Sequence, residues 1–528
     1  MVNHHQRVCV VFALALVAAG GGCNFGQSGI DPPTNRIFLP AGVVADPAAD
    51  LVYVVNSNSD LRFNAGTIAV VDLASVSANT AAVAVLDRCQ LADGTVLTAS
   101  TGCPAAPTAP APVCTKTRFS RTEPVPDDYC CRDLVDSNLL NCNEPQFVQA
   151  HATVALGSFG SAIQLQSFHR VPDDSSSELV RRLFVAVRAE PSITFADVTV
   201  QGGQASIRCT GPRGGGATQP EGAYCDDHWR LRRPSGVTPG ALVLPEEPHL
   251  LALDDDAHGI LYVGHLTVTA NAQVQGGGVS AVDVCDPQSD TSVRFAGLAR
   301  KTFLPETLSQ AVAALSPGDP LNTDTRVYAT ARYSTALSGM VLRDPAQATC
   351  VRGGAERDLT MMPAETFFSS AFLPHGADIR GILFSGDGSK AYVLHRNDSD
   401  SAANPPAIAV LDRTRLDDGT VANTPLAVLE VCSGPTSMQM HPDRSDRIYV
   451  TCYDDGQIYV VDPVALVVVA AIDAGAGPTS LVFSHLDHGW AYVASYANSH
   501  LSVIDLKPGS PTENHVILRI GLPHGYGE

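Results

Sequence analysis

The stretch Gly434-Pro435-Thr436-Ser437 recurs further along the chain as Gly477-Pro478-Thr479-Ser480, and the residues that follow the two copies correspond without a gap. Tyr449-Val450 corresponds to Tyr492-Val493, and the Val-Val-Asp at 460–462 corresponds to the Val-Ile-Asp at 503–505. A period of about 43 residues made of short strands is typical of the blades of a β-propeller.

The first copy contains the four strands that one blade needs. Runs of β-forming residues at 436–440, 448–453, 458–461 and 467–472 are separated by turn residues, among them Asp455-Gly456 and the strand-ending Asp462-Pro463. Glycine accepts a positive φ in a tight hairpin, and proline cannot donate to a ladder. The pattern therefore predicts four antiparallel strands in each repeat.

These residues resemble the YVTN-repeat family of bacterial β-propellers. The resemblance rests on the Gly-Pro opening of each copy, on Tyr449-Val450-Thr451 and on the Ile-Tyr-Val-Val-Asp at 458–462, and it is strong over 432–505 and weaker upstream. It implies a closed ring, usually of seven blades. It implies no single activity, because this fold serves many functions.

Weaker copies upstream predict an all-β, seven-bladed propeller of four-stranded blades over residues 36–528. Second strands are expected at 51–56, 183–187, 261–265, 327–330 and 391–395. The fourth strand of the first blade is expected at 83–87, and 339–342 has to serve as the third strand of the fourth blade. To close the ring, 516–520 should be the outer strand of the last blade. Ile37-Phe38-Leu39 should pair there too, so that both termini meet at one blade without an open edge.

The first residues differ from the rest. Arg7 precedes an apolar run at 8–19, which predicts a signal peptide over 1–22. The Gly20-Gly21-Gly22-Cys23 that follows resembles a bacterial lipoprotein signal, with Cys23 as the lipidated residue and 23–35 as lipidated N-terminus and spacer. Gly20 departs from the usual leucine, and ordinary signal cleavage is the alternative. Asn24 resembles lipoproteins sorted to an outer membrane. We expect an exported protein, lipid-anchored in the cell envelope or otherwise periplasmic or secreted.

The formal net charge is −20. Such a surface repels phosphate backbones and acidic lipid head groups. Nucleic acid is therefore not an expected partner, and membrane contact is expected through the lipid anchor only. We expect a monomer.

Apart from Cys9 and Cys23, twelve cysteines remain, an even number that indicates disulfides in an oxidising compartment. An insertion at 89–142 carries six of them, whose pairing the sequence leaves open: Cys89, Cys103, Cys114, Cys130, Cys131 and Cys142. Cys209 and Cys225 flank a Gly-rich loop and are expected to pair. Cys432 and Cys452 lie where two antiparallel neighbours bring their ends together, so a disulfide is expected, with buried thiols as the alternative. Zinc binding is the other reading of the cysteines, but no C-x-x-C pair occurs.

Five histidines could face the mouth of the central channel, near the starts of inner strands or the ends of second strands: His249, His265, His375, His395 and His524. Neutral imidazole binds metals, so a metal or cofactor is one reading. The other is that they occupy repeat positions and make ordinary hydrogen bonds. We predict no cofactor, with a metal at the channel mouth as the alternative. Asp254-Asp255-Asp256 could be a fragment of a calcium loop, although a solvated turn fits better.

An aspartate ends the third strand of most blades, and its repetition indicates a structural role in the following turn: Asp72, Asp197, Asp283, Asp412, Asp462 and Asp505. No G-x-S-x-G, H-E-x-x-H, G-x-x-x-x-G-K or G-x-G-x-x-G motif occurs. The favoured function is non-enzymatic binding of an envelope protein or glycan. The alternative is a periplasmic propeller enzyme, lactonase-like or carrying a metal or redox cofactor, with its site at the channel mouth.

Overall fold

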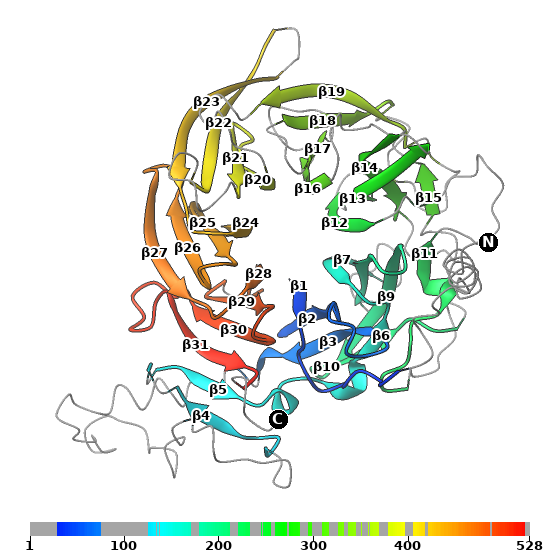
Figure 1. Cartoon of the computed structure of the whole chain (residues 1–528), viewed down its shortest axis with the longest axis vertical. Coiled ribbons are helices and arrows are strands. Elements are labelled where there is room, and N and C mark those ends of the chain that lie inside the picture. The colour runs from blue at the N-terminus through cyan, green and yellow to red at the C-terminus, as the bar shows by residue number, and fades with distance from the viewer. Residues whose placement is uncertain are drawn as a thin grey trace, which may run out of the picture.

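The computed structural model describes residues 29–74, 76, 114, 125–133, 135–136, 138–169, 179–211, 220–232, 244, 247–254, 259–271, 274–285, 294–297, 309–315, 326–331, 336–344, 350, 357, 359–368, 378–396, 405–417, 421–485 and 488–522. Seven antiparallel sheets follow one another around a ring (Figure 1), which confirms the predicted seven-bladed propeller. In each sheet the first strand lies nearest the ring axis and the last lies at the rim.

The strands of the first four blades are assigned as follows. Blade one comprises β1 (Pro40–Ala45), β2 (Leu51–Asn56), β3 (Gly66–Asp72) and β6 (Val154–Leu156). Blade two comprises β7 (Gly160–His169), β8 (Leu179–Val187), β9 (Ser192–Gln201) and β10 (Gln204–Arg208), with β11 (Arg230–Arg232) also on β9. Blade three comprises β12 (Pro248–Asp254), β13 (Ile260–Asn271), β14 (Val274–Asp283) and β15 (Arg294–Gly297). Blade four comprises β16 (Ser309–Leu315), β17 (Arg326–Ala331), β18 (Ala336–Leu342) and β19 (Met361–Phe368).

The last three blades are the most regular. Blade five comprises β20 (Ile379–Phe384), β21 (Lys390–His395), β22 (Ala407–Arg415) and β23 (Val421–Glu430). Blade six comprises β24 (Pro435–His441), β25 (Arg444–Cys452), β26 (Gln457–Asp462) and β27 (Val467–Asp473). Blade seven comprises β28 (Pro478–Phe483), β29 (Trp490–Ser495), β30 (His500–Asp505) and β31 (His515–Ile520), and carries β5 (Leu140–Cys142) and β4 (Cys130–Arg132) outside β31. Three short 3-10 helices are η2 (Glu144–Gln146), η3 (Ala150–Ala152) and η4 (Asp227–Trp229). None of the helices in the described residues is long and apolar enough to cross a bilayer.

The apolar core lies between neighbouring blades. Because both faces of a blade are covered by its neighbours, second and third strands are mostly buried, and β2 is buried along its whole length. The repeated aromatic residue of the second strand is buried in every blade: Tyr53, Phe184, Tyr262, Tyr328, Tyr392, Tyr449 and Tyr492. These large side chains fill the wedge between adjacent sheets, which is why the tyrosine marks each repeat.

The blade-ending aspartates have the structural role that their repetition indicated. Four of them accept a hydrogen bond from the backbone N–H two residues later: Asp72, Asp283, Asp462 and Asp505. Asp197 binds Arg182 of its own blade, and Asp412 accepts from the Thr414 hydroxyl. In the four blades with this backbone bond the aspartate shapes the turn after the third strand, whereas Asp197 and Asp412 lie within β9 and β22 and do not end them as expected.

Ring closure differs from the sequence-based expectation. The four strands β28 to β31 of blade seven follow one another in the chain, with β31 in the predicted outer position, and residues 37–39 add no strand to them, so the expectation that both termini share one blade is wrong. Residues 37–39 form no strand. Instead Ile37 packs in the cluster between blades one and seven, and the Leu39 N–H donates to Ser499 Oγ at 3.1 Å. The ring closes by packing and hydrogen bonds between two complete blades.

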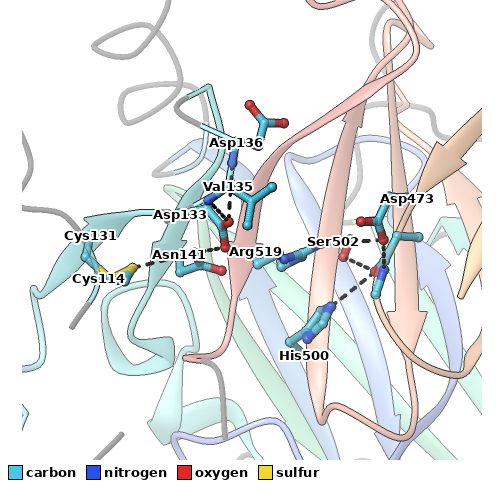
Figure 2. A network of polar contacts seen from close by, with 12 residues as sticks. Cys114, Cys131, Asp133, Val135, Asp136, Asn141, Asp473, His500, Ser502 and Arg519 are labelled. Atoms are coloured by element: carbon cyan, nitrogen blue, oxygen red, sulfur yellow. Dashed lines mark hydrogen bonds and ion pairs between the residues drawn. A yellow bond between two sulfur atoms is a disulfide. The ribbon is translucent and has the colours of Figure 1, made fainter. Parts of the chain in front are cut away.

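The Cys-rich insertion reaches across this closure. It leaves blade one after β3 and returns as β6, so β6 takes the fourth position of that blade; the strand expected at 83–87 lies outside the described residues. Between them, the hairpin β4–β5 adds to blade seven, with β5 pairing parallel to β31. Figure 2 shows Asn141 of β5 and Asp133 beside Arg519 of β31. The insertion thus covers the outer edge of the last blade.

Candidate binding site at the mouth of the ring

One face of the ring carries the loops that lead into the inner strands and out of the second strands; we call it the mouth face. A single hydrogen bond recurs there. In six of the seven blades the residue before the inner strand accepts, through its carbonyl, from the N–H of a residue within or just after the second strand, at 2.8 to 3.2 Å, and the residue before β16 of blade four lies outside the described residues. The pairs, acceptor first, are Leu39 and Ser57, Phe159 and Arg188, Glu247 and Leu266, Asp378 and Arg396, Gly434 and Tyr453, and Gly477 and Tyr496.

Each acceptor residue in this ring of hydrogen bonds has a positive φ. Glycine meets this need in the two regular blades, with φ of 63° at Gly434 and 69° at Gly477. The other described blades place a side chain there instead: Leu39, Phe159, Glu247 and Asp378, with φ between 44° and 81°. A left-handed conformation costs a side-chain-bearing residue about 1–2 kcal/mol. Strain of this kind gathers at functional positions, so these residues mark the mouth face as the candidate site.

Side chains of the mouth face link neighbouring blades. Arg188 of blade two lies 3.5 Å from Glu247 of blade three, and Arg396 of blade five lies 3.3 Å from Asp454 of blade six. The rings of Tyr453 and Tyr496 join blades six and seven with centroids 6.5 Å apart. The Tyr496 hydroxyl in turn bonds the Ser59 hydroxyl of blade one. These contacts link blade two to blade three, and blade five through blades six and seven to blade one.

His249 is the one predicted histidine that the structure places on the mouth side of an inner strand, partly exposed on β12. The Ser161 hydroxyl donates to its backbone carbonyl at 2.7 Å and so ties blade two to blade three. Burial, and after it the guanidinium groups of Arg188 and Arg380, lower the pKa of His249 to about 3. The imidazole is therefore neutral near pH 7, and the same positive charges oppose a metal cation beside it.

His265 and His395 do not face the mouth as expected, because both are completely buried. Each pairs with the first residue of its inner strand. We call this the tether position, because its side chain holds the loop entering the blade in three other blades. Asn56 accepts from the Phe38 N–H, Ser495 donates to the Ala474 carbonyl, and Cys452 is bonded to Cys432. His265 Nε2 bonds the Ser280 hydroxyl at 2.8 Å. The two histidines thus occupy a structural repeat position.

Five disulfides occur among the described residues. Cys432–Cys452 and Cys209–Cys225, the two pairs favoured by the sequence, have Cα atoms 5.7 Å and 4.8 Å apart. The insertion contains Cys114–Cys131 and Cys130–Cys142, a crossed arrangement that the sequence could not resolve. Cys285–Cys350, which joins blade three to blade four, was not anticipated. The sequence could have indicated this bond by elimination, because Cys285 and Cys350 were the two cysteines that had no candidate partner.

Several predicted residues lie outside the described part of the chain: Cys23, Cys89, Cys103, the signal peptide over 1–22, His375, His524, and Asp255 and Asp256 of the possible calcium loop. Asp254 itself is buried at the end of β12. Among the described residues, no group of three or more His, Cys, Asp or Glu side chains is placed to hold a metal ion.

No protein-family model and no curated protein sequence matches this chain. Solved structures resemble it at low identity. A functionally unknown protein from Desulfotomaculum acetoxidans aligns with a TM-score of 0.36 and 10% identity over 70% of this chain and 92% of its own. A protein from Lactobacillus plantarum aligns with a TM-score of 0.36 and 12% identity over 83% and 85%. Hydrazine synthase of Kuenenia stuttgartiensis aligns with a TM-score of 0.33 and 13% identity over 92% and 99%. The class of protein is thus defined by the chain's own strand pairing: a seven-bladed β-propeller with disulfides.

Proposed function

We propose that this chain is an exported lipoprotein of the bacterial cell envelope whose propeller binds a protein or glycan partner at the mouth face, without catalysis. The observation that carries the binding site is the set of strained side-chain-bearing residues before the inner strands of blades one, two, three and five. In blades six and seven, Gly434 and Gly477 adopt the same positive φ, so glycine is sufficient for the backbone conformation at this position. A retained side chain at an energetic cost points to a role outside folding.

Export is supported by the cysteines. Five disulfides in the described residues fit an oxidising compartment, where such bonds persist. The apolar run before Cys23 and the net charge of −20 agree with a protein anchored by lipid rather than by a basic surface. The spacer at 23–35 would hold the ring away from the bilayer.

Lipidation is tested by metabolic labelling with an alkyne fatty acid in a bacterial host. We expect the full chain to carry the label and to fractionate with membranes. Cys23→Ser should lose the label and be found in the soluble exported fraction. A labelled Cys23→Ser variant, or an unlabelled wild-type protein, would show that lipid attachment at Cys23 is wrong.

Binding at the mouth face is tested with a photo-crosslinking amino acid. We would place it at Ala497, exposed beside Tyr496, and, as the matched control, at Val464, which is 75% exposed in the turn before β27 of the neighbouring blade. Irradiation of intact cells should give an adduct from position 497 that is absent from position 464. Equal adducts from both positions, or none from position 497, would place partner binding elsewhere.

A further inference from the structure

We infer that Tyr453 and Tyr496, with Asp454, Arg396 and Ser59, form a platform on the mouth face that binds an uncharged sugar chain. This inference rests on the proposed binding function and names its ligand class. The five residues come from four consecutive blades, five, six, seven and one, so the platform curves around part of the mouth face.

The two tyrosines are held by the fold. They occupy equivalent positions in blades six and seven, and their backbone N–H groups donate to Gly434 and Gly477 at 2.9 Å and 2.8 Å. Both side chains are partly exposed, and the ring planes are inclined by 48°. The centroid separation of 6.5 Å lies within the range of aromatic rings that contact one another, so the two rings form one continuous surface. The exposed part of this surface offers an apolar face against which the C–H face of a pyranose ring can pack.

The glycines of these blades make room for the platform. A Cβ on Gly477 would lie 3.0 Å from Cε2 of Tyr453, so the tyrosine ring extends over a position that carries no side chain. A Cβ on Gly434 would fall against the carboxylate of Asp454. Blades six and seven therefore use glycine at the position where other blades carry side chains, and the tyrosine and aspartate fill the space.

Hydrogen-bonding groups lie beside the rings. Asp454 accepts from the Arg396 guanidinium at 3.3 Å, while their side chains remain 42% and 30% exposed. A carboxylate and a guanidinium are planar groups that can each bond two neighbouring hydroxyls. Burial, and after it the nearby Tyr496 and Asp454, raise the pKa of Tyr453, so its phenol stays protonated. The Ser59 hydroxyl adds a polar group at the other end of the platform.

Charge favours a neutral ligand. The chain carries −20 overall, which repels an anionic polysaccharide. The charged pair within the platform, Arg396 and Asp454, sums to zero, so the platform itself carries no net charge that a charged ligand would neutralise. An uncharged sugar chain needs only stacking and hydrogen bonds, which the platform supplies.

The test is affinity electrophoresis of the purified, oxidised full chain in gels containing dextran, laminarin, mannan or, as the anionic comparison, alginate. We expect retardation by at least one neutral polysaccharide and none by alginate. Tyr453→Ala and Tyr496→Ala should each weaken binding about ten-fold or more, as truncation of an aromatic hot spot does. Tyr453→Phe should keep most of the affinity because it keeps the stacking face.

Tyr459→Ala is the matched control, since Tyr459 is a partly exposed tyrosine of the same blade in the middle of β26. It should bind like the wild type. Circular dichroism of each variant checks that the ring is folded. If no neutral polysaccharide binds but the crosslinked adduct at position 497 is a protein that the tyrosine variants lose, the sugar inference is wrong and the binding function stands. If neither is found, both are wrong.

Discussion

The guanidinium of Arg519 on β31 lies 3.8 Å from the carboxylate of Asp133 in the Cys-rich insertion (Figure 2). The same side chain lies 3.8 Å from Asp473 at the end of blade six. Asp133 is fixed by Asn141 and by the Val135 and Asp136 N–H groups, which, against the opposing effect of burial, lower its pKa. The last strand of the ring is therefore held between blade six and a segment inserted in blade one.

The first prediction concerns this insertion. Replacing Cys114 and Cys131 together by Ser should destabilise the hairpin by about 3 kcal/mol, because the bond closes a loop of moderate length. Hydrogen exchange should then quicken at 515–520, which loses its outer neighbour, and remain slow at 379–384. Arg519→Ala should change stability by less than about 1 kcal/mol, since its ion pairs are long and partly solvated. Unchanged exchange at 515–520 after loss of the disulfide would contradict the covering role.

The second prediction concerns the tether position of blade six. In blade seven, Gly475 and Ser495 occupy the positions of Cys432 and Cys452, and the Ser495 hydroxyl donates to the Ala474 carbonyl. Substitution can therefore replace the disulfide of blade six by this hydrogen-bonded arrangement. Cys432→Gly with Cys452→Ser should therefore retain more stability than Cys432→Ala with Cys452→Ala, which should lose about 3 kcal/mol. Urea midpoints under oxidising conditions measure the difference. Equal losses in the two double variants would mean that the serine cannot replace the bond.

The third prediction concerns a buried ion pair between blades one and two. Arg181 Nε lies 2.8 Å from Asp46 Oδ2, and the Tyr53 hydroxyl donates to the same carboxylate at 2.6 Å. Arg181→Met should cost about 3–5 kcal/mol because it leaves a buried carboxylate without its counter-ion. Tyr53→Phe should cost about 1.5–3 kcal/mol, the value of a hydrogen bond to a charged group. Chemical denaturation measures both, and a milder effect of Arg181→Met than of Tyr53→Phe would contradict the ranking.

The fourth prediction compares two glycines of the mouth face. Gly434→Ala should cost about 1 kcal/mol, because its positive φ is strained but the Asp454 side chain in its way can rotate. Gly477→Ala should cost about 2 kcal/mol or more, since the added Cβ also lies 2.9 Å from the backbone nitrogen of Ala497, which cannot move aside. Thermal unfolding gives the order, and a reversed order would contradict the account.

The fifth prediction is a pH dependence from His395. Burial lowers the pKa of this imidazole to about 4, below the value of about 6.5 in an unfolded chain. Above pH 6.5 both states are neutral. As the pH falls from 6.5 towards 4, the unfolded chain binds a proton that the folded chain does not, so stability decreases. His395→Asn introduces the residue that blade one carries at the tether position, Asn56. This variant should show a smaller change in the free energy of unfolding between pH 6.5 and 4. A profile as steep as that of the wild type would assign the acid sensitivity to other groups.

The repeat could predict the blades because each carries the same buried aromatic residue and turn aspartate. Tyr449 and Asp462 have counterparts through most of the ring, the tyrosine because it fills the space between sheets and the aspartate because it bonds the turn that follows. The position of β6 could not be predicted, because the insertion separates it from the repeat that it completes. The sequence did not reveal the positive φ of four residues, namely Leu39, Phe159, Glu247 and Asp378. Only glycine in the sequence normally signals a positive φ, and these positions carry other residues. Strain held by the surrounding fold leaves no local sequence signal.

The parallel pairing of β5 with β31 has a consequence for the order in which the molecule is made. The hairpin β4–β5 is synthesised before β6 and before blades two to seven, and its two disulfides join residues within 114–142. Its partner strand β31 is synthesised only after the strands of blades two to six and the first three strands of blade seven. Contacts between distant parts of a chain form late because loop closure opposes them. We therefore expect oxidation of these cysteines, which are close in the chain, to precede the pairing of β5 with β31 that covers the last blade.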